Sequence, residues 1–477
     1  MKKLIALLLA LTMLVAFAAC GETQPEQTSA PEQTKAPEQT NAPETTAPAT
    51  EPEAEAMTHE EFVAAELETE VVIETYVQAV ESWWDGCVQI YAQSEDGGYY
   101  IYDLACSEED AAKLVPGTKI RVTGYKAEWS GEVEIIDAKY EILEGSWLVE
   151  KAADVTALMG TDELAAHLNE LVAVNGLTVV AANEEGAAFL YKWDGSGKQG
   201  DDLYFNVALG DQTFTFTVNA YMIGTGVDSD VYKAVEALEV GDVISVEGFL
   251  YWYNGAQPHV TKLIPITTHE EFVAAEMDTE VTVETYVQAI ESWWDGCVQV
   301  YAQSPDGGYY IYDLACSEED AAKLVPGTKI RVTGYKGEWA GEVEIMDATF
   351  EILEGSWIAE EATDVTALMG TDELAAHMNE LVAVNGLTVV ASNDAGAAFL
   401  YKWDGSGKQG DDLYFNVEIG GQVYTFTVNA YMVGTGVDSD VYKAVENLKV
   451  GDKINIEGFL YWYNAAQPHV TSVTVAE

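Results

Sequence analysis

Short runs of alternating apolar and polar residues recur along the chain from about residue 58, and glycine, aspartate or asparagine separates one run from the next. Alternation with a period of two is typical of β-strands that have one buried face. The first such runs predict strands over 71–80, 87–93, 99–104, 118–125 and 132–143. Short helices accompany them: one begins at Thr58 with a capping box to Glu61, and one begins at Ser107, before the fourth strand.

The pattern is repeated after 210 residues without a gap, so that Trp83 corresponds to Trp293. Inside each repeat the pattern occurs twice, because VPGTKIRVTG in the first half has a counterpart, EVGDVISVEG, in the second half. A helical run, TDELAAHLNE from Thr161, leads into the second half. These periodicities predict two near-identical units, each built from two domains of the same kind.

The order strand, strand, strand, helix, strand, strand, with a GxxxxVxG start to the fourth strand, resembles the OB-fold, a small five-stranded barrel that binds oligonucleotides or oligosaccharides. The resemblance implies a mainly β protein with short helices and four tandem OB-fold-like β-barrels. The chain as a whole is similar to bacterial surface lipoproteins with tandem OB-fold domains. The expected barrel domains span 57–148, 149–266, 267–358 and 359–477.

The chain begins MKKLIALLLALTMLVAFAAC, where two lysines precede an apolar run and small residues precede Cys20. This arrangement predicts an export signal over 1–19. The ending AFAAC resembles a bacterial lipobox, which implies lipidation of Cys20, and a plain secretory cleavage near Ala19 is the alternative. The Pro-, Glu- and Thr-rich segment 20–56 has little to bury and is expected to be an extended, disordered tether. We therefore expect an extracytoplasmic protein that is anchored to the cell membrane by its lipid.

Two adjacent tryptophans in ESWWDG, residues 81–86, are expected in the loop between the first two strands, and Trp129 in the loop between the last two. In OB-folds these loops flank the ligand face. A four-residue turn over 95–98 would accept the proline that stands at 305 in the second repeat. The resulting register pairs Ser94 with Tyr99, Tyr91 with Tyr102 and Cys87 with Cys106, and directs Gln89, Tyr91, Gln93, Tyr100 and Tyr102 outward.

These outward aromatic and amide groups predict a surface that stacks against, and hydrogen-bonds to, a neutral glycan or a peptide. The alternative is that some of the rings cover the barrel or pack against the neighbouring domain. The second domain of each unit is expected to be a structural partner or a weaker site. The candidate ligand-binding residues are Trp83, Trp84, Tyr91, Tyr100, Tyr102, Trp129, Trp293, Trp294, Tyr301, Tyr310, Tyr312 and Trp339.

The chain has 22 lysines and arginines against 81 aspartates and glutamates, a formal net charge of −59. Because phosphate backbones are bound mainly by lysine and arginine, this balance disfavours nucleic acid as a partner. Three functions stay open: a lipid-anchored binding module for a neutral glycan or peptide, a non-catalytic spacer or adhesin stalk, and an OB-fold nucleic-acid binder. The oligomeric state is left open.

Catalytic motifs such as HExxH, GxSxG and the phosphate-binding loop do not occur in the sequence, so we expect a protein that is not an enzyme. No cofactor is expected. The loop WDGSGKQGDD offers oxygen ligands for calcium, with a plain polar turn as the simpler interpretation. The candidate ligands are Asp194, Ser196, Asp201 and Asp202.

The four cysteines after Cys20 lie in two pairs, one in each repeat, at the open ends of the predicted hairpins. The predicted register places Cys87 opposite Cys106, and Cys297 opposite Cys316, at the short separation of a non-hydrogen-bonded pair. Export permits oxidation, so we predict a disulfide in each repeat. Free, buried thiols are the alternative.

Overall fold

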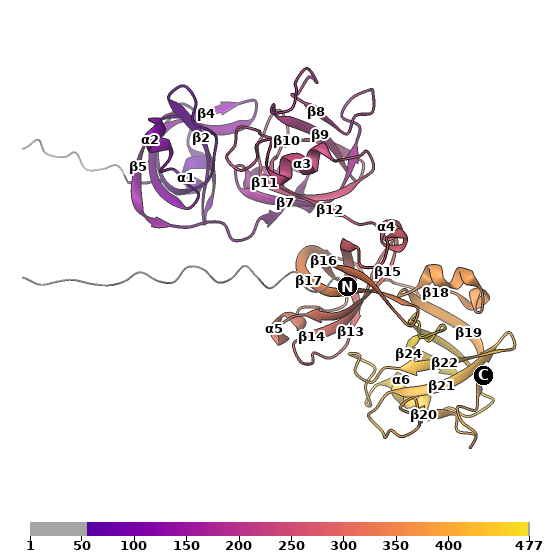
Figure 1. Ribbon diagram of the computed structural model, residues 1–477. Helices are drawn as coiled ribbons and strands as arrows, with labels where there is room; N and C mark the ends of the chain where they lie inside the picture. Colours follow the sequence, from indigo (N-terminus) through magenta and orange to yellow (C-terminus); the bar gives the residue numbers. More distant parts are fainter. Residues whose placement is uncertain (1–54, 476–477) are drawn as a thin grey trace, which may run out of the picture. The chain divides into compact units, whose positions relative to one another are not determined.

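The computed structural model describes residues 55–475 (Figure 1). The expected signal peptide, the lipidation site at Cys20 and nearly all of the expected tether lie outside the described residues. Within 55–475, no helix has the length and apolarity needed to cross a bilayer.

The first half of the first repeat is a closed barrel with the strand order β1-β2-β3-β5-β4. A capping box between Thr58 and Glu61 starts α1, as the sequence predicts. Its barrel core contains Ile90, Ala92 and Ile101, which alternate with outward side chains along β2 and β3. The elements are α1 (His59–Ala64), β1 (Glu70–Val80), β2 (Cys87–Ser94), β3 (Gly97–Ala105), α2 (Glu108–Ala111), β4 (Thr118–Trp129) and β5 (Glu132–Ser146).

The second half is a seven-stranded sheet in the order β6-β7-β11-β12-β10-β9-β8, and an additional pairing of β7 with β9 closes five of these strands into a ring. The helix expected after Thr161 is a 3-10 helix without a side-chain cap. The elements are β6 (Ala153–Asp154), η1 (Thr156–Leu158), η2 (Asp162–His167), β7 (Leu171–Val180), β8 (Phe189–Tyr191), β9 (Leu203–Leu209), β10 (Gln212–Val218), α3 (Asp230–Glu236), β11 (Val243–Phe249) and β12 (His259–Ile266).

The second repeat has the same elements in the same order, so the predicted fold class, tandem OB-fold-like β domains in two similar units, is confirmed. Its first half comprises α4 (His269–Ala274), β13 (Glu280–Ile290), β14 (Cys297–Ser304), β15 (Gly307–Ala315), α5 (Glu318–Ala321), β16 (Thr328–Trp339) and β17 (Glu342–Ser356). Its second half comprises β18 (Thr363–Asp364), η3 (Thr366–Leu368), η4 (Asp372–His377), β19 (Leu381–Val390), β20 (Phe399–Tyr401), β21 (Leu413–Ile419), β22 (Gln422–Val428), α6 (Asp440–Glu446), β23 (Lys453–Phe459) and β24 (His469–Val475).

The register of the β2–β3 hairpin differs from the predicted one. Ser94 pairs with Gly97 and Tyr91 with Tyr100, so the turn has two residues instead of four. A proline is tolerated at the first position of such a turn, because the φ angle fixed by its ring suits that position. The prediction that the proline at 305 requires a four-residue turn was therefore wrong. Because the register moved by two residues, each side chain in this part of the hairpin kept its predicted face.

A bulge between Val88 and Ile90 then shifts the pairing by one residue, and Cys87 lies opposite Ala105, not opposite Cys106. The predicted pairing of the two cysteines was therefore wrong, because a bulge adds a residue to one strand and leaves no trace in the alternating pattern.

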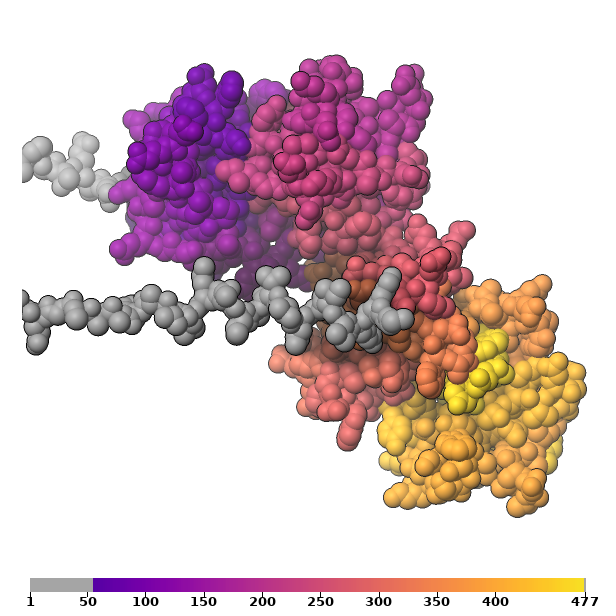
Figure 2. Space-filling view, viewed as in Figure 1, coloured from indigo at the N-terminus to yellow at the C-terminus, as the bar shows by residue number. Residues whose placement is uncertain are grey.

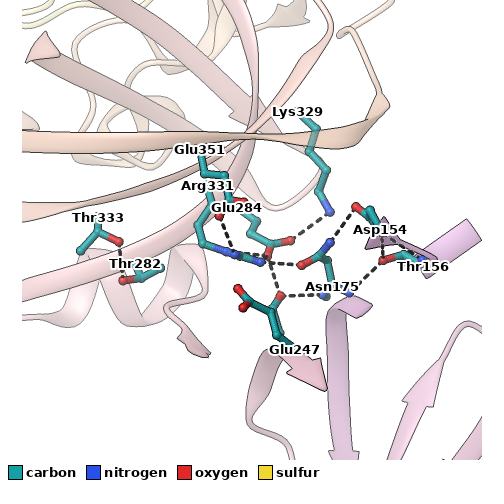
Figure 3. A network of polar contacts seen from close by, with 12 residues as sticks. Asp154, Thr156, Asn175, Glu247, Thr282, Glu284, Lys329, Arg331, Thr333 and Glu351 are labelled. Atoms are coloured by element: carbon teal, nitrogen blue, oxygen red, sulfur yellow. Dashed lines mark hydrogen bonds and ion pairs between the residues drawn. The ribbon is translucent and has the colours of Figure 1, made fainter. Parts of the chain in front are cut away.

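A network of polar contacts joins the second domain of the first repeat to the first barrel of the second repeat (Figure 3). Arg331 Nη2 donates to Asn175 Oδ1 at 2.5 Å and to Glu284 Oε1 at 2.7 Å. Ser245 Oγ donates to the same carboxylate oxygen at 2.6 Å. We call these four residues the junction.

Candidate functional site

Figure 2 shows the two barrels of the first repeat in indigo and magenta. They meet through a buried apolar cluster formed by Ala79, Tyr91, Tyr100, Met222 and Phe249, which we call the seam. The ring of Tyr91 stacks on Phe249 with 4.6 Å between centroids and 10° between planes. Its hydroxyl lies 2.9 Å from Nδ1 of His259. The alternative interpretation, packing against the neighbouring domain, therefore describes Tyr91 and Tyr100.

The second repeat has an equivalent seam around Tyr301 and Tyr310. Tyr301 stacks on Phe459 with the same 4.6 Å between centroids, and its hydroxyl lies 2.9 Å from Nδ1 of His469. Four of the predicted ligand-binding tyrosines thus hold domains together in this structure.

Beside the seam of the first repeat lies a cavity of about 690 Å³ that side chains from both barrels line, and we call it the cleft. Its aromatic lining consists of Tyr100, Trp129, Trp193, Tyr204, Tyr221, Tyr251 and Tyr253. Its neutral polar lining consists of Gln89, Asn206, Thr215, Thr217, Asn219, Gln257 and His259. The charged side chains in the lining are Glu81 and Asp202.

Two loops hold the tryptophans of the cleft open to solvent. Trp129 ends β4, directly before a tight turn in which Ser130 and Gly131 both have positive φ angles. Its ring lies 5.2 Å from that of Tyr253, and the two residues are 54% and 45% exposed. Trp193 follows β8 and is 69% exposed. The cleft therefore presents ring faces from each barrel to one space.

The other predicted residues lie outside this cavity. Trp83 is 37% exposed, and its Nε1 donates to the backbone oxygen of Cys106 at 3.0 Å, which ties the 81–86 loop to the end of β3. Trp84 is 79% exposed and Tyr102 is 40% exposed. Trp293, Trp294 and Tyr312 repeat this placement in the second repeat, and Trp339 there corresponds to Trp129. Of the predicted residues in the first repeat, Tyr100 and Trp129 line the cleft.

Most of the aromatic lining comes from the second barrel, which the sequence indicated only as a weaker site. Alternation along β9 and β10 directs Tyr204, Asn206 and Thr215 outward, and this signal was present in the sequence. Alternation does not show which surface of the other barrel these outward side chains face.

Two polar groups deep in the cleft can bond to a ligand. Burial lowers the pKa of His259 to about 4, so its ring is neutral near pH 7. Nδ1 is bonded to Tyr91 and Nε2 is the second ring nitrogen, available as a donor or acceptor. Thr217 is 2% exposed, and its hydroxyl has no partner among the described residues.

The acidic groups of the cleft hold protons more strongly than usual. Burial raises the pKa of Glu81 to about 7, although Asn219 Nδ2 donates to its Oε1 at 2.6 Å. Burial also raises the pKa of Asp202, whose Oδ1 accepts from the backbone N–H of Ala220 at 2.8 Å. Glu81 is thus partly protonated near neutral pH.

A third carboxyl group, Glu132, lies behind the cleft. Burial raises its pKa to about 8, and its Oε2 accepts from the backbone N–H of Trp252 at 2.8 Å. Its Oε1 and the Oδ1 of Asn169 are both buried without a partner among the described residues. Both atoms are acceptors when Glu132 is ionised, which is consistent with a carboxyl group that keeps its proton.

The candidate calcium loop is a polar turn in this structure. Asp194 Oδ1 accepts from the backbone N–H of Ser196 at 3.1 Å and from its hydroxyl at 2.6 Å. Asp201 Oδ2 accepts from the backbone N–H of Lys198 at 2.9 Å. Across residues 55–475, no group of three or more histidine, cysteine, aspartate or glutamate side chains is arranged to hold a metal ion.

The cysteines of both repeats, Cys87, Cys106, Cys297 and Cys316, are free thiols in this structure. The Sγ of Cys87 donates to the backbone oxygen of Trp84 at 3.2 Å. Burial raises the pKa of both Cys87 and Cys106, which disfavours reactive thiolates. The register that motivated a disulfide is not the one observed.

No family model matches the chain, and no curated protein matches its sequence. Solved structures similar to it include a murine DNA binding protein bound with double-stranded DNA, at 9% identity and a TM-score of 0.17, covering 60% of this chain and 100% of that chain. A replication protein A heterotrimer bound to single-stranded DNA has 8% identity and a TM-score of 0.20, covering 61% of this chain and 95% of that chain. Both of these proteins have DNA bound. The expectation that nucleic acid is disfavoured as a partner does not stand, because the net charge of a whole chain does not describe the local charge of one surface.

Proposed function

We propose that each repeat is a non-catalytic binding module whose cleft takes a neutral carbohydrate, and that the lipidated tether displays the two modules outside the cell. The observation that supports the proposal most directly is the lining of the cleft, which contains exposed aromatic rings together with amide and hydroxyl groups. Rings stack on the apolar faces of sugars, and amides and hydroxyls pair with sugar hydroxyls.

The geometry supports contact with more than one face of a sugar. Trp129 and Tyr253 form a tilted pair of rings, with 36° between their planes, at one wall of the cleft. Thr217 and His259 lie among the polar groups of the same lining and offer a hydroxyl and a ring nitrogen. A ligand seated between them would bury apolar area on the rings and satisfy these polar groups.

The second repeat carries the same lining residues at its equivalent positions, except that Ser392 stands where the first repeat has Ala182. Two sites of nearly identical chemistry on one chain would bind a polymer with avidity, because the second contact is intramolecular.

Single-stranded nucleic acid is the second candidate. Trp129 and Trp193 are both more than half exposed, and exposed rings of this kind stack on bases as well as on sugars.

The test is a glycan array and a set of single-stranded DNA oligonucleotides, followed by isothermal titration with the full chain. Replacing Trp129 and Trp193, together with Trp339 and Trp403, by alanine should weaken carbohydrate binding about tenfold or more, a change of about 1.4 kcal/mol. Trp84→Ala with Trp294→Ala is the matched control, because these tryptophans lie outside the cleft lining.

Carbohydrate binding that survives the four substitutions would move the site away from the cleft. DNA binding that the four substitutions abolish, with no glycan bound, would assign the cleft to nucleic acid. Anchoring is tested separately: Cys20→Ala should release the protein from membranes and prevent incorporation of labelled fatty acid.

A further inference from the structure

A second cavity, of about 770 Å³, lies next to the cleft of the first repeat, and we call it the side pocket. The 3-10 helix η2, the β9–β10 hairpin and the loop between β11 and β12 supply its walls. Thr215, Tyr253 and Gln257 line both cavities. Because the same side chains border both spaces, the two cavities are adjacent, on either side of Tyr253 and Gln257.

We infer that the side pocket is an extension subsite, so that the first repeat takes a linear oligosaccharide that is longer than the cleft alone holds. This inference rests on the proposed carbohydrate function. The side pocket has the chemistry of a sugar site, because its lining contains the ring of Trp252 and the hydroxyls of Thr161 and Thr213. Trp252 is held in place by its backbone bond to Glu132.

The second repeat provides a natural comparison, because the lining residues of the side pocket differ between the repeats at three positions, whereas those of the cleft differ at one. Val423, Tyr424 and Ala465 replace Thr213, Phe214 and Gly255. These changes remove the hydroxyl of Thr213, add the hydroxyl of Tyr424 and add the methyl of Ala465 to the wall.

The added hydroxyl of Tyr424 lies close to Gly370, the counterpart of the pocket-lining Gly160. It donates to Gln422 Oε1 at 2.7 Å, and a β-carbon at Gly370 would lie only 2.8 Å from its oxygen. The equivalent glycine in the first repeat, Gly160, lines the side pocket, and its nearest neighbour is the side chain of Gln212, while Phe214 in the same lining carries no hydroxyl. At position 255 a β-carbon would enter open space, so the methyl of Ala465 and the hydroxyl of Tyr424 leave a ligand less room in the second repeat.

The experiment uses the full chain with Trp339→Ala and Trp403→Ala, which disable the cleft of the second repeat. The probes are neutral cello-, xylo-, malto- and chito-oligosaccharides, each from disaccharide to hexasaccharide, titrated calorimetrically. In at least one series, affinity should rise about tenfold with chain length. The triple variant Thr213→Val, Phe214→Tyr, Gly255→Ala should remove this rise and leave disaccharide affinity unchanged.

The matched control is Lys139→Thr with Glu185→Ala, which also introduces residues of the second repeat but at exposed positions outside both cavities. It should keep the dependence on length. The reciprocal variant should gain the dependence of affinity on chain length. It carries Val423→Thr, Tyr424→Phe and Ala465→Gly in a chain whose first cleft is disabled by Trp129→Ala and Trp193→Ala. A gain of this kind cannot be caused by misfolding.

Binding that does not depend on length, or a length dependence that the triple variant leaves intact, overturns the extension subsite and leaves the cleft proposal standing. If no series binds and the glycan array is also blank, both proposals are overturned.

Discussion

The seam within each repeat and the junction between the repeats join similar barrels by different chemistry. At the seam, Tyr91 is 2% exposed and stacks on an apolar ring. At the junction, Arg331 and Glu284 form an ion pair whose side chains are both 7% exposed. The seam occurs in both repeats with the same geometry, whereas the junction is formed once.

The junction also shows how a neighbouring domain changes the burial of a glutamate that both repeats contain. Glu74 and Glu284 occupy equivalent strand positions and each pairs with a lysine, yet their side chains are 32% and 7% exposed. Burial by itself would raise the pKa of Glu284, but Lys329 and Ser245 hold it below its usual value. Nearly identical local sequence therefore has different burial, depending on what packs against it, although the pKa of both carboxyl groups is lowered.

Breaking the seam should have the largest effect. Tyr91→Ala with Tyr301→Ala removes a stacked, buried ring and leaves a histidine nitrogen without its partner, and should lower the free energy of unfolding by about 3–5 kcal/mol for each repeat. Urea unfolding of the full chain measures it. Tyr102→Ala with Tyr312→Ala, at 40% exposure, should change it by less than about 0.5 kcal/mol. Equal losses in the two variants would show that the seam does not stabilise the fold.

The stability of the chain should also depend on pH through Glu132, whose carboxyl group accepts a hydrogen bond from Trp252 of the other barrel. The pKa of Glu132 rises from 4.5 to about 8 on folding, so between these values the folded state holds a proton that the unfolded state has lost. The stabilisation contributed by this group should therefore be fully present below about pH 4.5 and should be lost as the pH rises to about 8. The free energy of unfolding should fall by at most about 1.4 kcal/mol per pH unit for each such group.

Glu132→Gln with Glu342→Gln keeps the shape and removes this titration. The variant should have a shallower decline of melting temperature between pH 5 and pH 8 than the unmodified chain, with the remaining slope due to other raised groups such as Glu81. An unchanged slope would contradict the assignment of the proton to Glu132.

A smaller effect is expected at the junction. Arg331→Ala leaves Lys329 to pair with Glu284, so we expect a loss on the order of 1 kcal/mol that affects the docking of the repeats more than the folding of either. Small-angle scattering should show a broader distribution of distances between repeats, and high salt should change the variant less than the unmodified chain. Lys113→Ala, which breaks an exposed pair with Asp110, should have no such effect.

The smallest effect should come from the most exposed ring. Trp84→Ala with Trp294→Ala removes side chains at 79% exposure, outside seam, junction and cleft, and should change the free energy of unfolding by less than about 0.5 kcal/mol. The same urea titration measures it. A loss comparable to that of the Tyr91 variant would mean that the 81–86 loop contributes to the fold through contacts of these rings.

The sequence predicted the fold well because its signals are local. Alternation identified the barrel strands and their inward residues, and the glycine pattern identified the second barrel in each repeat. The hairpin register was predicted less well, since a bulge near Val88 and a two-residue turn before Gly97 are compatible with the same alternation. The cleft was predicted only in part: Trp129 was found from its loop, whereas Trp193 and Tyr253 were not among the candidates.

By itself the sequence determined that the chain is a duplicated pair of OB-fold-like barrels and that Tyr91, Tyr100 and Trp129 face away from the barrel interior. Only the tertiary structure decided which of these outward rings became buried and which stayed open. Alternation separates the inside of a barrel from its outside through neighbours along one strand. It contains no information on which outside surface a second domain covers, because that depends on contacts such as Tyr91 with Phe249, whose residues lie far apart in the chain.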